Sequence, residues 1–169
     1  MAGYGAGVLH AKPMPPIYAR AIARLKCGKY TEAEWEIAAS AEPNSARDGY
    51  AEHRRHFPWG DEQPAPKLAN LDWRAGGLVE VGAHPAGDSA FGCRQMIGNV
   101  WEWTADDFLP YPGFTVDPYK EYSKPWFGTH KGLRGGCWAT SSLLIRNTWR
   151  NFYTPDRRDV WAGFRTCAR

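Results

Sequence analysis

Apolar residues recur along this chain at two spacings, which predict helices first and short strands afterwards. Ile17, Ala21 and Leu25 repeat at helical spacing up to Gly28, so a helix of about three turns is expected there. A second helix is predicted to open with a capping box at Thr31–Glu34, which favours a capping role for Glu34 over a catalytic one. Its apolar stripe consists of Trp35, Ile37 and Ala38, and Pro43 follows it.

The rest of the chain alternates short apolar runs with turns rich in glycine and proline, which predicts short strands. The expected strands are residues 68–73, 78–81, 133–138, 146–152 and 160–165. Residues 104–132 are rich in Pro, Gly and aromatic side chains and predict a long loop. Such a loop either carries a site or only covers the core.

Composition adds that the core is aromatic and the regular secondary structure sparse. Nine Trp, eight Tyr and seven Phe accompany 18 Gly and 13 Pro. The length of 169 residues fits one domain, and we assign 1–15 to a flexible lead and 16–169 to the domain. A formal charge of +3 is too small to indicate a nucleic-acid partner. No apolar run approaches the roughly 20 residues of a membrane span, and no signal peptide is evident, so a cytoplasmic protein is expected.

Charged and metal-binding side chains leave two interpretations open. Residues 134–169 contain seven Arg, two Asp and no Lys. Arginine forks suit an anionic ligand, but they equally suit a framework role in which they bridge loops to backbone carbonyls. His53 and His56 lie three residues apart without a third ligand nearby, which favours exposed histidines over a metal site. The four cysteines lack CxxC spacing and predict free, buried thiols.

Five short motifs follow one another along the chain. They are Thr31–Glu36 (TEAEWE), Phe57–Gly60 (FPWG), Gly98–Trp103 (GNVWEW), Arg134–Gly136 (RGG) and Gly163–Arg165 (GFR). Their order resembles the formylglycine-generating enzyme (sulfatase-modifying factor) superfamily. The resemblance implies an α+β domain with a C-type-lectin-like fold and low regular secondary structure. The usual first strand of that fold has no counterpart, so the domain is expected to be N-terminally truncated.

Three branches of this superfamily compete. The formylglycine-generating oxidases bind copper through two cysteines, but the matching positions hold Thr140 and Ile145, so copper chemistry is not expected. The C-terminal domain of non-haem iron sulfoxide synthases, which make ergothioneine and its selenium analogue selenoneine, is more similar. It shares the Tyr111–Phe114 loop and the order Asn-Phe-Tyr-x-Pro-x-Arg-Arg near the C-terminus. Hypervariable lectin-like binding modules would carry unpatterned residues there instead.

The synthase resemblance implies a substrate-binding and catalytic-partner domain. Such enzymes use iron(II) and dioxygen to join a thiol or selenol compound to the imidazole of a trimethylated histidine. Their iron ligands come from a helical-bundle domain with an HxxxH pair, which this sequence lacks, so activity is expected only with such a partner. The alternative is a stand-alone lectin-like ligand-binding module without catalysis. An uncovered strand edge would also favour a homodimer.

The same resemblance implies a set of site residues. A tyrosine of the long loop is expected to donate a proton: Tyr119 is preferred, and Tyr111 and Tyr122 are rivals. Asn151 is expected to bind the carboxylate of the methylated histidine, and Arg157 the carboxylate of the second substrate. Aromatic faces would hold the trimethylammonium group by cation–π attraction, worth about 0.5 to 2 kcal/mol. The aromatic candidates are Trp103, Phe114, Phe152 and Tyr153, the last standing where some thiol-peptide-using members have an acidic residue, which leaves the co-substrate open.

Residues 91–103 place Glu102 between two tryptophans after a Gly-Asn turn. Superfamily members bind calcium at the positions that match Gln95, Gly98, Val100 and Glu102. Calcium prefers six to eight hard oxygen ligands, and Gln95 would supply a neutral one. A structural calcium site is therefore one expectation. The other is that Glu102 bonds loop amides without a metal, which would make this stretch scaffold.

Overall fold

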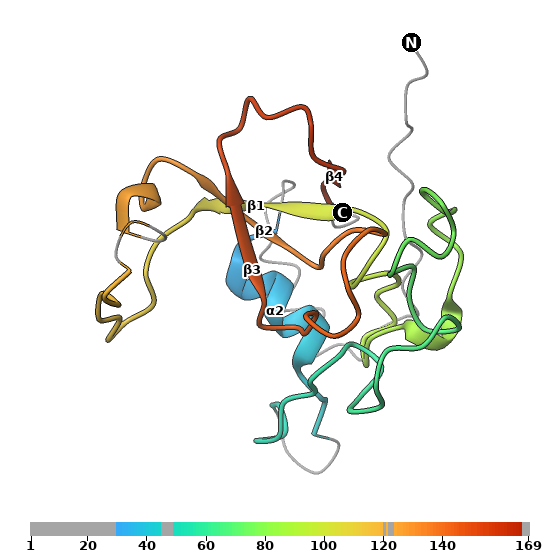
Figure 1. Ribbon diagram of the computed structural model, residues 1–169. Helices are drawn as coiled ribbons and strands as arrows, with labels where there is room; N and C mark the ends of the chain where they lie inside the picture. Colours follow the sequence, from blue (N-terminus) through green and yellow to red (C-terminus); the bar gives the residue numbers. More distant parts are fainter. Residues whose placement is uncertain (1–29, 45–48, 120, 122–123, 167–169) are drawn as a thin grey trace.

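The computed structural model describes residues 30–44, 49–119, 121 and 124–166 (Figure 1). The described part contains one α-helix, four strands and two short 3₁₀ turns, joined by long irregular segments, and is therefore α+β as predicted. The flexible lead predicted at 1–15 and the helix predicted at 17–28 lie outside these ranges. The elements are α2 (Glu32–Ser40), η1 (Pro85–Gly87), β1 (Trp101–Asp107), η3 (Lys124–Trp126), β2 (Lys131–Arg134), β3 (Arg150–Tyr153) and β4 (Ala162–Gly163).

Helix α2 begins with the predicted capping box. Thr31 Oγ1 accepts a hydrogen bond from the Glu34 N–H at 3.2 Å, and Glu34 Oε2 accepts one from the Thr31 N–H at 2.9 Å. This confirms that Glu34 caps the helix. Trp35 and Ala38 are buried, whereas Ile37 is only partly buried. The helix thus presents one apolar side to the core.

The four strands form a mixed sheet in the order β3-β2-β1-β4, with β1–β2 and β2–β3 antiparallel and β1–β4 parallel. The register aligns Glu102, Arg134 and Arg150 in one row across the sheet, and the next row runs from Trp103 to Asn151. Successive residues of a strand point to opposite faces. The first row therefore faces α2, which lies across that side of the sheet (Figure 1), and the second row faces away from it.

The strands predicted at 68–73 and 78–81 are wrong, because both segments are built of turns and irregular structure. Asp72 and Trp73 have left-handed backbones, with φ of 59° and 62°, which no strand accommodates. Long-range contacts hold this conformation: the N–H of Trp73 bonds to the carbonyl of Trp138 at 3.0 Å. The apolar residues of the first segment still reach the core, but as an irregular strap.

The remaining segments differ from prediction mainly in their bounds. The long loop predicted at 104–132 is shorter, because β1 continues through Asp107 and β2 begins at Lys131. Strand β2 ends at Arg134 and is followed by Gly135 and Gly136, whose φ values of 89° and 73° are left-handed. β2 overlaps the strand predicted at 133–138 only at 133–134, β3 begins four residues later and ends one residue later than the strand predicted at 146–152, and β4 is a two-residue part of the strand predicted at 160–165.

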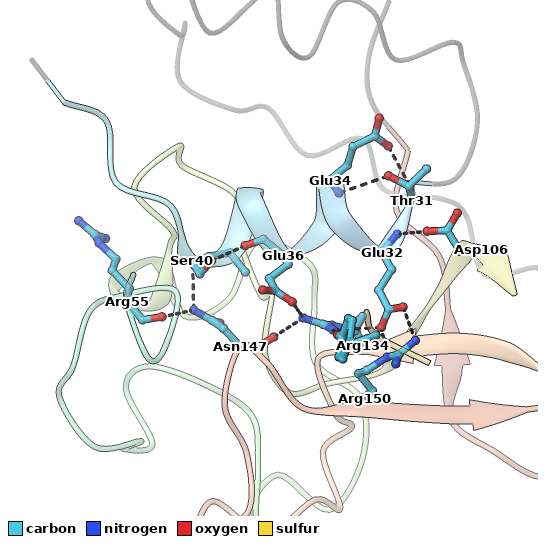
Figure 2. Close-up of polar contacts among 12 residues, drawn as sticks. Thr31, Glu32, Glu34, Glu36, Ser40, Arg55, Asp106, Arg134, Asn147 and Arg150 are labelled. Carbon is cyan, nitrogen blue, oxygen red and sulfur yellow. Dashed lines mark hydrogen bonds and ion pairs between the residues drawn. The ribbon is translucent and has the colours of Figure 1, made fainter. Parts of the chain in front are cut away.

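A buried ionic network joins α2 to the sheet (Figure 2). Arg134 has no exposed surface, and its two Nη atoms donate to Glu32 Oε1 at 3.0 Å and to Glu36 Oε2 at 2.6 Å. Arg150 donates to both oxygens of the same Glu32 at 2.6 and 2.7 Å. Burial would lower the pKa of Arg134, but Glu36 and Glu32 hold it above its ordinary value. Since Arg134 also bonds to the carbonyl of Asn147 at 2.6 Å, the framework role expected of these arginines is confirmed for it.

Replacing Glu32 by glutamine removes the charge that the two arginines share while keeping a similar shape. Because Arg134 is fully buried, its charge would be left poorly compensated, and we expect Glu32→Gln to lower the free energy of unfolding by about 3 kcal/mol. Urea denaturation followed by tryptophan fluorescence measures this loss.

The matched control is Glu36→Gln, on the same helix and paired with the same arginine. The Glu36 side chain is 35% exposed, so solvent compensates much of its charge, and the expected loss is only about 1 kcal/mol. Equal losses for the two variants would contradict the central place of Glu32 in the network.

Candidate functional site

Two of the three predicted site residues of β3, Asn151 and Tyr153, lie on the face of the sheet that points away from α2. Asn151 and Tyr153 are neighbours on this face, because they are two residues apart in one strand. Asn151 Nδ2 donates to the Tyr153 hydroxyl at 3.3 Å, and Asn151 Oδ1 accepts from the N–H of Phe152 at 2.8 Å. Both side chains are partly buried, so the strand orients an amide and a phenol side by side.

Arg157 continues this arrangement in the turn after β3. Its N–H bonds to the carbonyl of Thr154 at 3.1 Å, and its guanidinium carbon lies 4.8 Å from the ring centroid of Tyr153. Its Nε and Nη2 donate to the two carboxylate oxygens of Asp159 at 2.6 and 2.7 Å. These hydrogen bonds from Arg157 hold the pKa of Asp159 below its ordinary value. The result is a continuous polar chain, Asn151–Tyr153–Arg157–Asp159.

Asp159 was not among the residues predicted from the sequence. Its only signal there is the spacing Arg157-x-Asp159 in a polar turn, which is common in loops that have no site. The structure adds the information that the sequence lacks, namely that Arg157, the partner of Asp159, lies over the ring of Tyr153 in β3.

Trp103 lies on the same face as the polar chain. Trp103 and Tyr153 are both partly buried, and both pack against the core cluster of Trp101, Leu133 and Cys137. Trp103 therefore shares a face of the sheet with Asn151 and Tyr153, with Leu133 of β2 between Trp103 and Asn151.

Phe152 and Phe114 lie apart from this group. Phe152 points to the opposite face of β3 and stacks on Phe108 with ring centroids 4.3 Å apart. Phe114 packs edge-on against Phe127 at 5.3 Å, and Phe127 contacts Phe108 at 5.1 Å. The sheet thus divides the predicted aromatic set between two places.

The three candidate tyrosines differ in their surroundings. The hydroxyl of Tyr111 accepts a hydrogen bond from Arg134 Nη1 at 3.3 Å, and the guanidinium of Arg150 lies 4.3 Å from its ring centroid. Tyr111 is therefore part of the framework. Tyr119 is 67% exposed on the loop, and its N–H bonds to Asp117 Oδ1 at 3.1 Å. Tyr122 lies outside the described residues.

Two of the residues predicted to bind calcium, Gln95 and Glu102, contact Arg165. Arg165 donates to both oxygens of Glu102, at 2.6 and 3.0 Å, and the indole N–H of Trp35 donates to the same carboxylate at 2.7 Å. Arg165 also donates to the carbonyls of Arg94 and Gln95 at 3.0 and 3.3 Å. Glu102 therefore has charged and indole partners rather than the loop amides that were expected. Arg165 therefore occupies both oxygens of the carboxylate that was expected to bind calcium.

The other metal candidates are resolved by their contacts. His53 and His56 are exposed, as predicted, and His53 Nε2 lies 3.1 Å from Asp61 Oδ2. Within the described ranges no three His, Cys, Asp or Glu side chains come close enough to hold a metal ion.

Cys93 and Cys137 are free thiols, as predicted. Burial raises the pKa of the Cys93 thiol, which keeps it protonated near neutral pH.

Comparison with known proteins identifies the family. The profile of the sulfatase-modifying factor enzyme 1-like domain matches residues 17–169, and the chain belongs to this family. The hercynine oxygenase of Mycolicibacterium thermoresistibile is 45% identical to it over 140 residues, which cover 80% of this chain and 30% of that protein. The formylglycine-generating enzyme of Mycobacterium tuberculosis is 37% identical over 99 residues, covering 52% of this chain and 29% of that protein. The chain thus spans about 30% of the length of these relatives.

Solved structures of similar fold agree with this assignment. PvdO from Pseudomonas aeruginosa superposes with a TM-score of 0.57 at 28% identity, covering 87% of this chain and 55% of that one. Treponema denticola variable protein 1 superposes with a TM-score of 0.56 at 24% identity, covering 82% and 46%, which shows a shared fold alone. In the described residues no helix has the length and apolar character needed to cross a membrane.

The contacts of Glu102 predict how the protein responds to calcium. Because Arg165 already neutralises Glu102, we expect neither millimolar calcium nor EDTA to shift the melting temperature by more than about 1 °C. Differential scanning fluorimetry measures the shift, with magnesium as the ionic control. A rise of several degrees that is specific for calcium and lost in Glu102→Gln would show instead that Arg165 gives way to the ion.

Proposed function

We propose that this chain is the substrate-binding and catalytic-partner domain of an iron(II)- and dioxygen-dependent synthase with a C-type-lectin-like fold. The reaction would join a sulfur or selenium atom to the imidazole of hercynine, the trimethylated betaine of histidine. The observation that carries the proposal is the 45% identity to a hercynine oxygenase over 140 residues. The polar chain on β3 supports it, because it gathers amide, phenol and guanidinium groups suited to small zwitterionic ligands.

The iron would be held by a helical-bundle partner with an HxxxH pair and would supply the activation of dioxygen. This chain would bind and orient the organic substrates. Asn151 keeps one of its two amide hydrogens for a substrate carboxylate, since the bond to Tyr153 uses only the other. Tyr119, on the exposed loop, would hold the proton at its phenol oxygen. A homodimer is a further arrangement that this proposal allows.

The cation–π role falls to Trp103 on physical grounds. The guanidinium of Arg157 covers one face of Tyr153, and a second cation beside it would be repelled. Phe108 covers one face of Phe152 on the other side of the sheet. Of the predicted aromatic residues, Trp103 remains as the candidate on the face of the sheet that carries Asn151. Indole is the strongest of the aromatic cation binders.

Truncating this ring should weaken the binding of hercynine. We expect Trp103→Leu to raise the dissociation constant for hercynine by about tenfold, because the cation–π term is lost. Isothermal titration calorimetry on the full chain measures this, and Trp126→Leu, which removes an exposed indole of the η3 turn, is the matched control. Histidine, which lacks the methyl groups, should bind both variants alike. An unchanged affinity in Trp103→Leu would move the ammonium site elsewhere.

Turnover tests the proposal directly. Iron content and oxygen consumption would be measured with hercynine and a thiol or a selenol, with and without a helical-bundle domain carrying an HxxxH pair. We expect iron uptake and oxygen consumption only when that domain is present, because among the described residues no three His, Cys, Asp or Glu side chains come close enough to hold a metal ion. Binding of hercynine without any turnover in the presence of the partner would overturn the synthase and leave a ligand-binding module.

A further inference from the structure

We propose that Tyr111 is a positioning residue for the loop that carries Tyr119, and that it acts by stacking its ring on the guanidinium of Arg150. The inference rests on the proposed function, in which Tyr119 holds the proton. It adds that the ionic network between α2 and the sheet also sets the place of this loop. Tyr111 itself would neither give nor take a proton in the reaction.

The loop between β1 and β2 is poorly covered by the rest of the fold. It extends away from the sheet (Figure 1), and every residue from Leu109 to Tyr119 is exposed. A segment with so little buried surface opens easily unless specific contacts hold it. The position of Tyr119 therefore depends on where the stem of the loop is anchored.

Arg150 supplies this anchor from the first position of β3. Its Nη1 donates to the carbonyl of Leu109 at 2.9 Å, and its guanidinium carbon lies 4.5 Å from the ring centroid of Phe108 and 4.3 Å from that of Tyr111. Its Nε and Nη2 donate to Glu32 at 2.6 and 2.7 Å, so the guanidinium is held in place from the side of the helix. Arg150 thus ties the stem of the loop to α2.

The ring of Tyr111, rather than its hydroxyl, carries most of this contact. The hydroxyl accepts from Arg134 Nη1 at 3.3 Å, which is long for a hydrogen bond, and the same Nη1 also donates to Glu32 at 3.0 Å. The ring lies on a guanidinium whose side chain is only 13% exposed, and desolvation strengthens a cation–π contact. Removing the ring should therefore free the stem, whereas removing the hydroxyl should not.

Tyr111→Leu removes both contacts, and Tyr111→Phe removes only the hydroxyl. Losing the ring should shift the closing equilibrium of the loop by about tenfold. For a loop with comparable open and closed populations, this shift changes each population by about threefold. Hydrogen exchange of the full chain, followed by mass spectrometry, should therefore be about threefold faster at residues 109–119 in Tyr111→Leu.

Two comparisons keep this measurement specific to the ring. Tyr111→Phe and the control Val116→Ala, an exposed substitution in the same loop, should leave the exchange at 109–119 unchanged. Exchange in α2 should be the same in all four proteins, because the anchor bears on the loop and not on the global fold.

Turnover with the helical-bundle domain gives the second readout. Tyr111→Leu should lower kcat by about threefold, because Tyr119 is in place less often. The KM and the calorimetric affinity for hercynine should stay unchanged, since Asn151 and Trp103 lie on the opposite face of the sheet from Arg150. Tyr111→Phe should keep the full kcat, which a tyrosine that transfers the proton itself could not do.

The outcomes separate this inference from the proposed function. Unchanged exchange at 109–119 in Tyr111→Leu would overturn the inference, and so would an equal loss of kcat in Tyr111→Phe, because the hydroxyl would then be the working group. A loss of hercynine affinity as large as the loss of kcat would also overturn it, since the substitution would then act on the whole fold. If the unsubstituted chain gives no turnover with the helical-bundle domain, the proposed function is overturned, and the exchange measurement still decides whether Tyr111 anchors the loop.

Discussion

The buried guanidinium of Arg134 is the constraint on which the rest of the structure depends. It has no exposed surface, so every unpaired N–H would carry a desolvation cost, and its carboxylate partners must be in place. Glu32 and Glu36, both on α2, accept hydrogen bonds from its two Nη groups, which fixes the helix on one side of the sheet (Figure 2). Glu32 then also holds Arg150, the first residue of β3. The strand that carries the polar chain of the site is therefore positioned by an ionic network on its opposite face.

Successive residues of β3 point to opposite faces of the sheet, so framework residues lie on one face and the proposed site residues lie on the other. In β3, Arg150 and Phe152 face the network and its aromatic neighbours, whereas Asn151 and Tyr153 face outward to the site. A shift of one residue in the register would exchange the two sets. The ionic contacts that Arg134 and Arg150 share with Glu32 oppose such a shift, because the shift would leave a buried charge unpaired. The position of the proposed site thus depends on an ionic network on the other face of the strand.

The sequence predicted the parts of this structure that depend on near neighbours. The capping box of α2 lies within four residues, so its signal is complete in the chain, and Glu34 was assigned correctly. The strand predicted at 68–73 failed because the left-handed backbone of Trp73 is set by Trp138, far along the chain. For the same reason the arginines could not be divided into framework and ligand residues. Arg134 finds its partners about 100 positions earlier, and only the fold brings them together.

The stretch around Glu102 shows how side chains add to the backbone pairing between distant segments of this chain. Glu102 receives Trp35 from the helix and Arg165 from the segment after β4, so residues distant in the sequence converge on one carboxylate. Burial would lower the pKa of Arg165, but the charge and hydrogen bonds of Glu102 raise it, and the guanidinium stays a permanent cation. Arg165 also donates to the carbonyls of Arg94 and Gln95. Calcium takes carbonyl oxygens of this kind as ligands. A protein cation held in this way joins α2, β1 and the segment after β4 on the face of the sheet that points away from Asn151 and Tyr153.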